Sequence, residues 1–397
     1  MTRPLLSERI QQLPYSGIRE IFDLAGKMED VIHFEIGEPD FDTPRNIIDA
    51  AFEAARNGAT HYTSSGGIVP LRNAIARRLT TTLGVSYEPE EIVVTSGGME
   101  ALLLSFIVTM DQGDELLLPA PHWPNYPAHA MLANARTVAV PLRIEDGYKP
   151  SIAALQQALT PNTRALLLNY PHNPTGATLD RNDLEPLAEF AIKNDLLVFS
   201  DEAYETLVFD DEFVSIASAP GMKERTIVLR TFSKSYAMTG WRVGYLAAPA
   251  PIAQKAAKLH EHTSACTSAL SQMAALAALD TPDTVPQEMV ASYRRRRDLL
   301  IHGLEAIPGL KPFTPRGTFY AFVDISALGK TAQEFALSLL RNAGVAVAPG
   351  TAFSEAGEGF IRICFANSDD NIREGLRRIE KAVQEMNAQS QSEAATP

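Results

Sequence analysis

The sequence predicts an α/β protein with a large domain built on a mostly parallel sheet, followed by a smaller α+β domain. Between about residues 46 and 281, short β-rich runs alternate with helix-like stretches. Apolar strands separated by helices are typical of a parallel sheet that helices cover on both faces. Residues 286–307 read as one long helix, and beyond it the pattern of strands and helices changes.

The elements of the large domain follow in a regular order. Its β-rich runs are EIVVT, DELLLPA, RALLLNY, LLVFSDE and TIVLRTF. The helix-like stretches between and after them include EALLLSFIVTM, LEPLAEFAIKN and PIAQKAAKLHEH. We place this domain at residues 46–285.

Both ends of the chain are expected to form the smaller domain. GTFYAFVDIS, VAVAPGTAF and FIRICFA read as strands, and AQEFALSLLRNAG and NIREGLRRIEKAVQEM read as the helices beside them. These segments place the C-terminal part of the domain at residues 286–386. Residues 1–45 do not fit the alternating block, so we expect them to pack on that part. Residues 387–397 are small and polar, which predicts a disordered tail.

Charge and composition exclude several functional classes. The chain has 397 residues and a net charge of −13, which disfavours binding to nucleic acids and anionic membranes. Two cysteines are too few for a disulfide framework or a metal cluster. No apolar run reaches the roughly 18 residues of a membrane helix, and the start lacks the pattern of a signal peptide. The expected location is the cytoplasm.

Candidate functional residues follow the predicted strands. Ligands of α/β sheets collect at the carboxyl ends of the strands. Gly97 and Gly98 follow the first run and precede a helix, and this arrangement favours an anion. Later strands are followed by an indole, an amide, a carboxylate, a phenol and an amine, which belong to Trp123, Asn173, Asp201, Tyr204 and Lys234.

This set of groups suits a phosphorylated aromatic aldehyde. The amine of Lys234 can form a Schiff base with a carbonyl, and a carboxylate can keep a pyridinium nitrogen protonated. An amide and a phenol can bind a ring oxygen, and an indole can stack on the ring. The glycine amides, Thr231 and a bidentate Arg242 can bind the phosphate.

Each residue alone also has an ordinary structural explanation. A single lysine is most often a surface residue, and Asp201 could cap a helix. Arg362 could be an edge-strand charge or a partner in a buried ion pair. LGKT at residues 328–331 is no P-loop, because Asp324 stands where that loop needs a glycine, and no G-x-G-x-x-G motif is present. The order of the residues on successive strands favours the functional interpretation.

A series of short motifs then identifies a family. From Gly37 to Ser368 the chain contains GEPDFDTP, HYTSSGG, VTSGGMEAL, PHWPNYP, YPHNPTG, SDEAYE, TFSKSYAMTGWRVGY, GTFYAF, VAVAPGTAF and FIRICFANS. In this order they resemble the pyridoxal-phosphate-dependent aminotransferases of fold type I, class I/II, which include aspartate and aromatic aminotransferases. The resemblance implies a mostly parallel seven-stranded sheet between helices, with a small domain built from both chain ends.

The resemblance also implies roles for single residues. It implies that Lys234 holds pyridoxal 5'-phosphate covalently and moves the proton of the substrate Cα. It also implies that Asp201 pairs with the pyridine nitrogen and that Tyr204 forms a hydrogen bond with the ring oxygen. These three are the predicted catalytic residues. The other residues implied in cofactor binding are Gly97, Gly98, Met99 through its backbone, Trp123, Asn173, Thr231, Ser233, Arg242 and, from the neighbouring subunit of a homodimer, Tyr62. The residues implied in substrate binding are Arg362, on the α-carboxylate, Gly37, Trp123 and Asn173.

The implied activity moves the amino group of an L-amino acid to a 2-oxo acid such as 2-oxoglutarate by a ping-pong mechanism. Met99 stands where one aspartate-preferring subgroup has a lysine, which favours aromatic or other neutral side chains over a dedicated dicarboxylate site. Residues 14–22 are expected to lie over the site. A β-lyase or oxidase on the same scaffold would keep the cofactor residues. A DNA-binding regulator is disfavoured by the acidic charge and by motifs that begin at Gly37.

Overall fold

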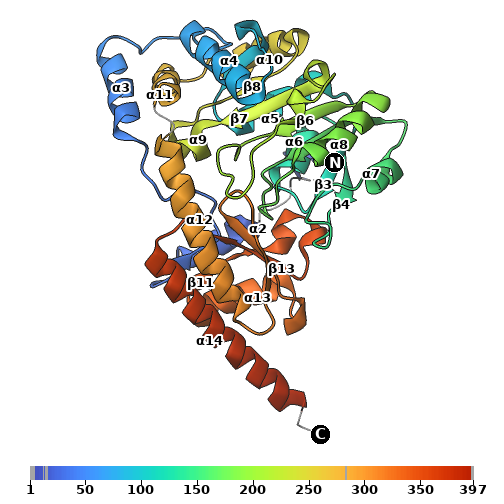
Figure 1. Cartoon of the computed structure of the whole chain (residues 1–397), viewed down its shortest axis with the longest axis vertical. Helices are drawn as coiled ribbons and strands as arrows, with labels where there is room; N and C mark the ends of the chain where they lie inside the picture. Colours follow the sequence, from blue (N-terminus) through green and yellow to red (C-terminus); the bar gives the residue numbers. More distant parts are fainter. Residues whose placement is uncertain (1–4, 12, 14–16, 282–283, 395–397) are drawn as a thin grey trace.

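The central feature of the fold is a seven-stranded, mostly parallel sheet (Figure 1). The computed structural model describes residues 5–11, 13, 17–281 and 284–394. The sheet has the order β2-β8-β7-β6-β5-β3-β4, and only β8 runs antiparallel to its neighbours. Its strands are β2 (Ile92–Thr95), β3 (Glu115–Ala120), β4 (Arg136–Pro141), β5 (Thr163–Asn169), β6 (Leu197–Asp201), β7 (Thr226–Thr231) and β8 (Gly244–Ala247).

Helices cover both faces of this sheet because its inner strands are apolar on both sides. In β5, Ala165 and Leu167 pack into one hydrophobic cluster, while Leu166 and Leu168 pack into another. This alternation follows from the two-residue period of a strand. The helices beside the sheet are α4 (Val69–Leu83), α5 (Gly98–Thr109), α6 (Asn125–Leu132), α7 (Ile152–Ala158), α8 (Arg181–Lys193), α10 (Ala250–Thr263) and α11 (Ala269–Leu279), and α3 (Arg45–Arg56) packs against α11.

A second layer of structure joins the two ends of the chain. β1 (Ile32–His33) pairs in parallel with β11 (Val345–Ala346), so the N-terminal segment packs on the C-terminal part. An antiparallel sheet of order β12-β13-β10-β9 lies beside this pair. Its strands are β9 (Lys311–Phe313), β10 (Tyr320–Asp324), β12 (Ala348–Pro349) and β13 (Phe360–Cys364). The fold class predicted from the sequence is therefore confirmed, while the domain boundaries stay predictions.

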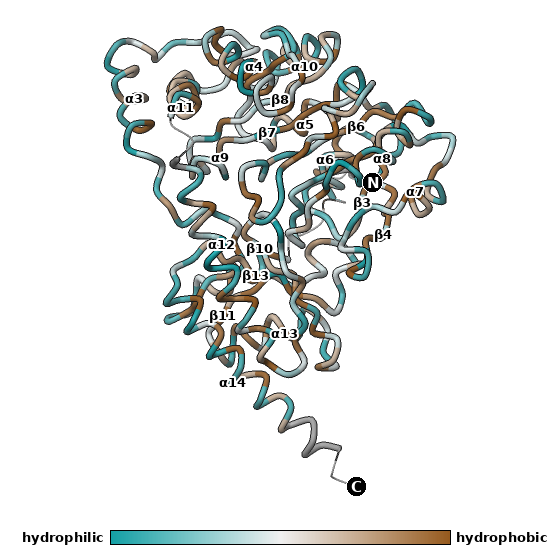
Figure 2. The backbone as a smooth tube through the Cα atoms, in the orientation of Figure 1, coloured by the Kyte–Doolittle hydropathy of each residue, from teal (hydrophilic) through white to brown (hydrophobic). Residues whose placement is uncertain are grey.

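Long helices connect and flank this part. α12 (Thr284–Glu305) links the two sheets, and α14 (Asp369–Ala394) packs against it (Figure 1). Figure 2 shows apolar and polar residues alternating along α14, as expected of a helix with one buried face. The shorter helices are α1 (Glu8–Gln11), α2 (Gly17–Ala25), α9 (Phe232–Ser235) and α13 (Ala332–Ser338).

The C-terminal end of the chain differs from the sequence expectation. The disordered tail expected at residues 387–397 is helical as far as Ala394, and residues 395–397 lie outside the described part. Alanine, glutamine and glutamate are good helix formers, so an existing helix can extend through this polar stretch. Lys234, which the sequence places directly after a strand, lies on the short helix α9 that follows β7. Within the described residues, no helix is long and apolar enough to cross a membrane.

Candidate active site

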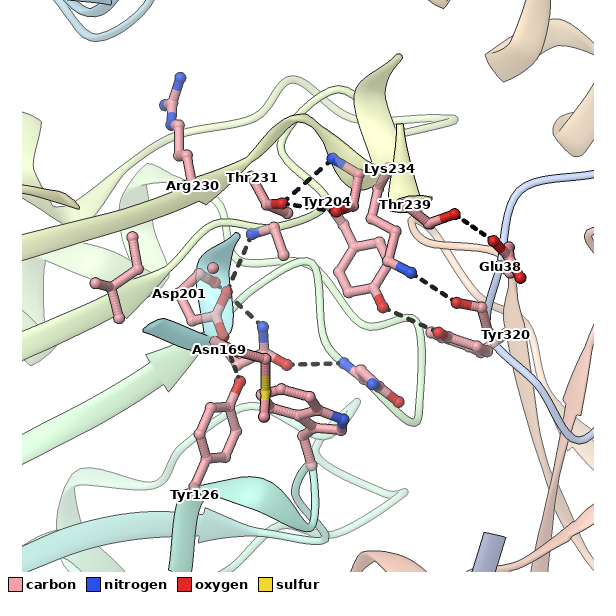
Figure 3. Close-up of a pocket in the computed structure, with 18 of the residues that line it drawn as sticks. Glu38, Tyr126, Asn169, Asp201, Tyr204, Arg230, Thr231, Lys234, Thr239 and Tyr320 are labelled. Atoms are coloured by element: carbon pink, nitrogen blue, oxygen red, sulfur yellow. Dashed lines mark hydrogen bonds between the residues drawn. The ribbon is translucent and has the colours of Figure 1, made fainter. Parts of the chain in front are cut away.

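A cavity of about 400 Å³ lies where three parallel strands end. β5, β6 and β7 end at Asn169, Asp201 and Thr231, and all three residues line the cavity. Figure 3 shows several of the side chains that face it. Of the residues selected from the sequence, all except Gly97 and Tyr62 line it: Gly37, Gly98, Met99, Trp123, Asn173, Asp201, Tyr204, Thr231, Ser233, Lys234, Arg242 and Arg362.

Lys234 brings a reactive amine into the cavity. Its Nζ donates a hydrogen bond of 2.6 Å to the carbonyl oxygen of Gly37 and lies 5.7 Å from the centre of the Phe319 ring. Burial lowers the pKa of Lys234 from 10.5 to about 8, because a charged amine is poorly solvated there. The amine is therefore a better nucleophile and base near neutral pH than an exposed lysine.

Asp201 is held in a fixed orientation by three donors. Tyr126 Oη donates to its Oδ2 at 2.7 Å, and the amide of Ala203 donates to its Oδ1 at 3.1 Å. Asn169 Nδ2 donates to its backbone carbonyl at 3.1 Å. Burial raises the pKa of Asp201 to about 6, and the hydrogen bond from Tyr126 opposes this rise. Sequence patterns alone do not single out Tyr126 or Asn169. Tyr126 lies inside the motif PHWPNYP, and Asn169 directly precedes the motif YPHNPTG.

An anion-binding arrangement surrounds the start of α5. No side chain caps this helix at Gly97, whose φ of 88° suits glycine, so its first amide groups are open to a ligand. A Cβ on Gly97 would lie 2.5 Å from Arg242 Nη2, which shows how closely the guanidinium approaches the backbone. Thr231 Oγ1 and Ser233 Oγ are hydrogen-bonded at 2.9 Å beside it.

Arg362 is a buried cation without a carboxylate partner among the described residues. Its Nη1 donates to Asn173 Oδ1 at 3.1 Å, and its Nη2 donates to the carbonyl oxygen of Glu35 at 2.6 Å. Its Nε is buried and has no partner in that part of the chain. The rings of Tyr320 and Phe353 lie 4.2 Å and 4.7 Å from its guanidinium carbon. Neither structural alternative for Arg362, an edge-strand charge or an ion pair, describes this environment.

Aromatic groups complete the walls of the cavity. The hydroxyls of Tyr204 and Tyr320 share a hydrogen bond of 2.9 Å (Figure 3). Trp123 meets Tyr126 edge to face, with ring centres 5.4 Å apart. Met99 is partly exposed, and Asn125 Nδ2 donates to its sulfur at 3.6 Å. Ile18, from the expected covering segment, also lines the cavity, whereas residues 14–16 lie outside the described part.

A buried ion pair lies next to Asp201 in sequence. Glu202 and Arg230 are almost fully buried and 2.8 Å apart, and Ser200 Oγ also donates to Glu202 at 2.9 Å. Glu202 does not line the cavity. Tyr62 lies elsewhere: its side chain is 89% exposed, in a separate hollow that it shares with Cys266.

Comparisons with known proteins agree on one family. The family described as "Aminotransferase class I and II" matches residues 29–379. An aspartate aminotransferase of Pyrococcus horikoshii is 39% identical over 383 residues, which are 96% of this chain and 97% of that protein. Aromatic-amino-acid aminotransferase 2 of Thermococcus litoralis is 40% identical, over 96% of this chain and 98% of that protein. A crystal structure of an aromatic aminotransferase from Pyrococcus horikoshii superimposes with a TM-score of 0.89 at 39% identity, covering 93% of this chain and 99% of that chain.

Proposed function

The chain belongs to the class I and II aminotransferases, and on that premise we propose that it uses pyridoxal 5'-phosphate to move the amino group of an L-amino acid to a 2-oxo acid. One observation carries the choice of substrate class. Arg362 keeps a buried guanidinium with an unpartnered Nε beside the amine of Lys234 in one cavity. A buried cation without a counter-charge favours an anionic ligand, and an α-carboxylate matches its forked geometry.

The donor groups fit the proposed cofactor. The open amides at the start of α5, together with Arg242, Thr231 and Ser233, suit its phosphate. Asp201 suits the pyridine nitrogen, because its carboxylate is fixed by donors and a bound cation would favour the charged form. Asn173 and Tyr204 suit the ring oxygen, and the half-buried Trp123 suits the ring face. When bound, the cofactor supplies an electron sink for the charge that forms at the substrate Cα.

The residues of the chain then divide the remaining work. Arg362 binds the substrate carboxylate and so orients the Cα–H bond, with Gly37 contributing a backbone contact. Lys234 would hold the cofactor covalently, and its free amine would act as the general base on the Cα proton. Asp201 would pair with the ring nitrogen and would favour its protonated form electrostatically. Tyr204, Asp201 and Lys234 are the proposed catalytic residues.

The proposed reaction is a ping-pong exchange in which 2-oxoglutarate is the expected acceptor. Met99, Ile18 and Ile36 line the cavity, and among the described residues that line it Lys234 is the only lysine. This composition supports a neutral or aromatic amino donor. The relatives are named for aspartate and for aromatic amino acids, so both donor classes are to be compared.

We further propose that the protein acts as a homodimer in the cytoplasm. The exposed Tyr62, which lies away from the cavity of its own chain, supports a role in the site of the neighbouring subunit. The two cysteines, Cys266 and Cys364, are both free, which is consistent with a reducing compartment.

A half-reaction tests the proposal. The loaded enzyme is mixed with one amino acid and no oxo acid, and the absorbance of the bound cofactor is followed across a panel of donors. We expect a single stoichiometric conversion to the amino form of the cofactor, which a 2-oxo acid then reverses. Continuous release of ammonia or pyruvate would instead indicate an oxidase or a lyase, which the names of the relatives do not favour.

A further inference from the structure

Residues 37–43, which we call the front segment, lie against the catalytic lysine. The carbonyl oxygen of Gly37 accepts the hydrogen bond from Lys234 Nζ at 2.6 Å. Glu38 accepts a hydrogen bond from Thr239 (Figure 3). At the other end of the segment, Thr43 Oγ1 donates to the carbonyl oxygen of Ala237 at 2.6 Å. The front segment therefore positions the carbonyl oxygen to which the amine of Lys234 is hydrogen-bonded.

A buried arginine on α12 holds the middle of the front segment. Arg296 is only 9% exposed, and its Nη1 lies 2.8 Å from Asp40 Oδ1. Its guanidinium carbon lies 5.5 Å from the centre of the Phe41 ring and 5.7 Å from that of Tyr293. Its Nε lies 3.3 Å from Asp369 Oδ1 at the start of α14. Ion pairing and ring contacts together fix the guanidinium more firmly than a surface salt bridge would.

The neighbouring arginines of the same helix make other contacts. Arg295 pairs with Asp369 at 3.1 Å, and its side chain is 60% exposed. Arg294 and Arg297 both pair with Asp210. Among these four arginines, the ion pairs within the described residues connect only Arg296 to the front segment. Arg295 is therefore a matched control, because it shares Asp369 with Arg296 but not Asp40.

We propose that Arg296 is a positioning residue of the active site: through Asp40 it holds the front segment so that the Gly37 carbonyl orients the amine of Lys234. This inference rests on the proposed aminotransferase reaction, in which that amine is released and takes a proton. Gly37 is pressed against Tyr320, since a Cβ on Gly37 would lie 1.8 Å from the Tyr320 hydroxyl oxygen. The segment therefore has little freedom while Asp40 stays anchored. Without Arg296, the Asp40 carboxylate loses its counter-charge and the anchor is lost.

Chemical labelling tests the geometry without requiring any turnover. The cofactor-free full-length chain is treated with an amine-acylating reagent near neutral pH, and labelling of Lys234 is measured by peptide mass spectrometry. We expect Arg296→Met and Asp40→Asn to raise the labelling rate of Lys234 roughly 3- to 10-fold, because the amine loses its hydrogen-bond acceptor. Arg295→Met should leave the rate unchanged. Equal rates in R296M and R295M would overturn the proposal.

The half-reaction of the loaded enzyme tests the consequence. We expect R296M and D40N each to lower the limiting rate of the amino-acid half-reaction roughly 10- to 100-fold, because small misplacements of catalytic groups carry costs of this size. The isotope effect of Cα-deuterated substrate should rise. Cofactor affinity should stay within about twofold of that of the unaltered protein, since neither residue belongs to the anion-binding arrangement at the start of α5. The double variant should be no slower than either single variant. If the rate losses of the two single variants add in the double variant, Arg296 and Asp40 do not act through the same interaction, which would contradict the proposal. If R296M does not fold, D40N alone tests it.

These two experiments separate the inference from the proposed function. If the chain performs no amino-group transfer, the half-reaction fails in the unaltered protein as well, while the labelling result still stands. If the unaltered protein transfers amino groups and R296M behaves as R295M does in both assays, only the positioning role is wrong.

Discussion

Tyr126 donates a hydrogen bond to Asp201, at 2.7 Å from its Oδ2, and thereby supports the charged form of a buried carboxylate. The two residues come from different elements, because Tyr126 lies on α6 and Asp201 ends β6. Burial alone would raise the pKa of Asp201 further than the value of about 6, and the phenol limits that rise. In the proposed function, the pair would set the pH range in which Asp201 can bind the cationic ring nitrogen of the cofactor.

Replacing Tyr126 by phenylalanine should shift cofactor binding towards higher pH. The folded pKa of Asp201 lies above its ordinary value of 3.8 and rises further without the phenol, so more of the carboxyl is protonated at neutral pH. A hydrogen bond to a charged group is worth about 1.5–3 kcal/mol. The acidic limb of the binding profile, where cofactor affinity falls as pH decreases, should therefore move to higher pH by about one unit or more. Fluorescence titration with pyridoxal 5'-phosphate from acidic to alkaline pH measures this. Tyr170→Phe, which loses a buried hydroxyl bonded to Tyr148, should leave the limb in place.

Replacing Lys234 by alanine should abolish both turnover and the yellow absorbance of the loaded protein. The variant loses the amine that would hold the cofactor and take the Cα proton. Absorbance spectra and single-turnover assays at matched protein concentration measure the two losses. A yellow, active variant would show that Lys234 is not the catalytic lysine.

Lys234 should also destabilise the cofactor-free protein at neutral pH. Its folded pKa of about 8 lies below the ordinary 10.5, so the charged amine costs stability below pH 8 and this cost disappears as pH rises towards 10.5. Lys234→Met should therefore raise the free energy of unfolding by about 1–3 kcal/mol near pH 7. The difference between the two proteins should shrink near pH 10. Urea denaturation at both pH values checks the trend, and a difference independent of pH would exclude titration of the amine as its cause.

Replacing Arg362 by lysine should weaken substrate binding while the cofactor stays bound. Lysine keeps the charge but loses the planar fork, and Asn173 and the Glu35 carbonyl lose their donors. We expect kcat/KM to fall roughly 100-fold for amino acids and oxo acids alike. Steady-state kinetics with both substrates, together with a cofactor titration, measure the effect. An equal loss of cofactor affinity would indicate a general disturbance of the site.

Replacing Gly37 by alanine should disturb the site through a direct overlap. The new Cβ would lie 1.8 Å from the Tyr320 hydroxyl oxygen and 2.7 Å from its Cζ. We expect destabilisation of about 1–3 kcal/mol and a marked loss of turnover. Adding Tyr320→Phe should restore part of the stability, because it removes the closest atom. Gly240→Ala, where no atom lies within 4 Å, should be close to neutral in thermal unfolding.

The inner strands and most of the residues that line the cavity could be predicted from the sequence, the strands from local apolar runs and the residues from strand ends and family motifs. Continuous apolar runs marked β3, β5, β6 and β7, and the rule of strand ends placed Asp201 and Thr231 at one edge. β4 and β8 were not identified. β4 is an edge strand with mostly exposed or half-buried residues. β8 has only four residues, and the first two, Gly244 and Tyr245, end a motif read for its chemistry.

The supporting contacts could not be predicted, because no local pattern encodes them. Tyr126 and Asp201 are 75 positions apart, and Arg296 and Asp40 are 256 positions apart. Of the four consecutive arginines at 294–297, Arg296 and Arg297 are buried, which their charge alone does not indicate. Such pairs arise only when the chain has folded, so they are found from the structure.

The neighbouring acids Asp201 and Glu202 make the length of β6 as important as its composition. Asp201 lines the cavity, whereas Glu202 is buried with Arg230, and successive side chains of extended backbone point to opposite sides. Losing or gaining a single residue within β6 would exchange the two carboxylates. The longer acid would then face the ligand, and Arg230 would lose its partner. The register of β6 against β5 and β7 therefore has to stay fixed for Asp201 to face the cavity.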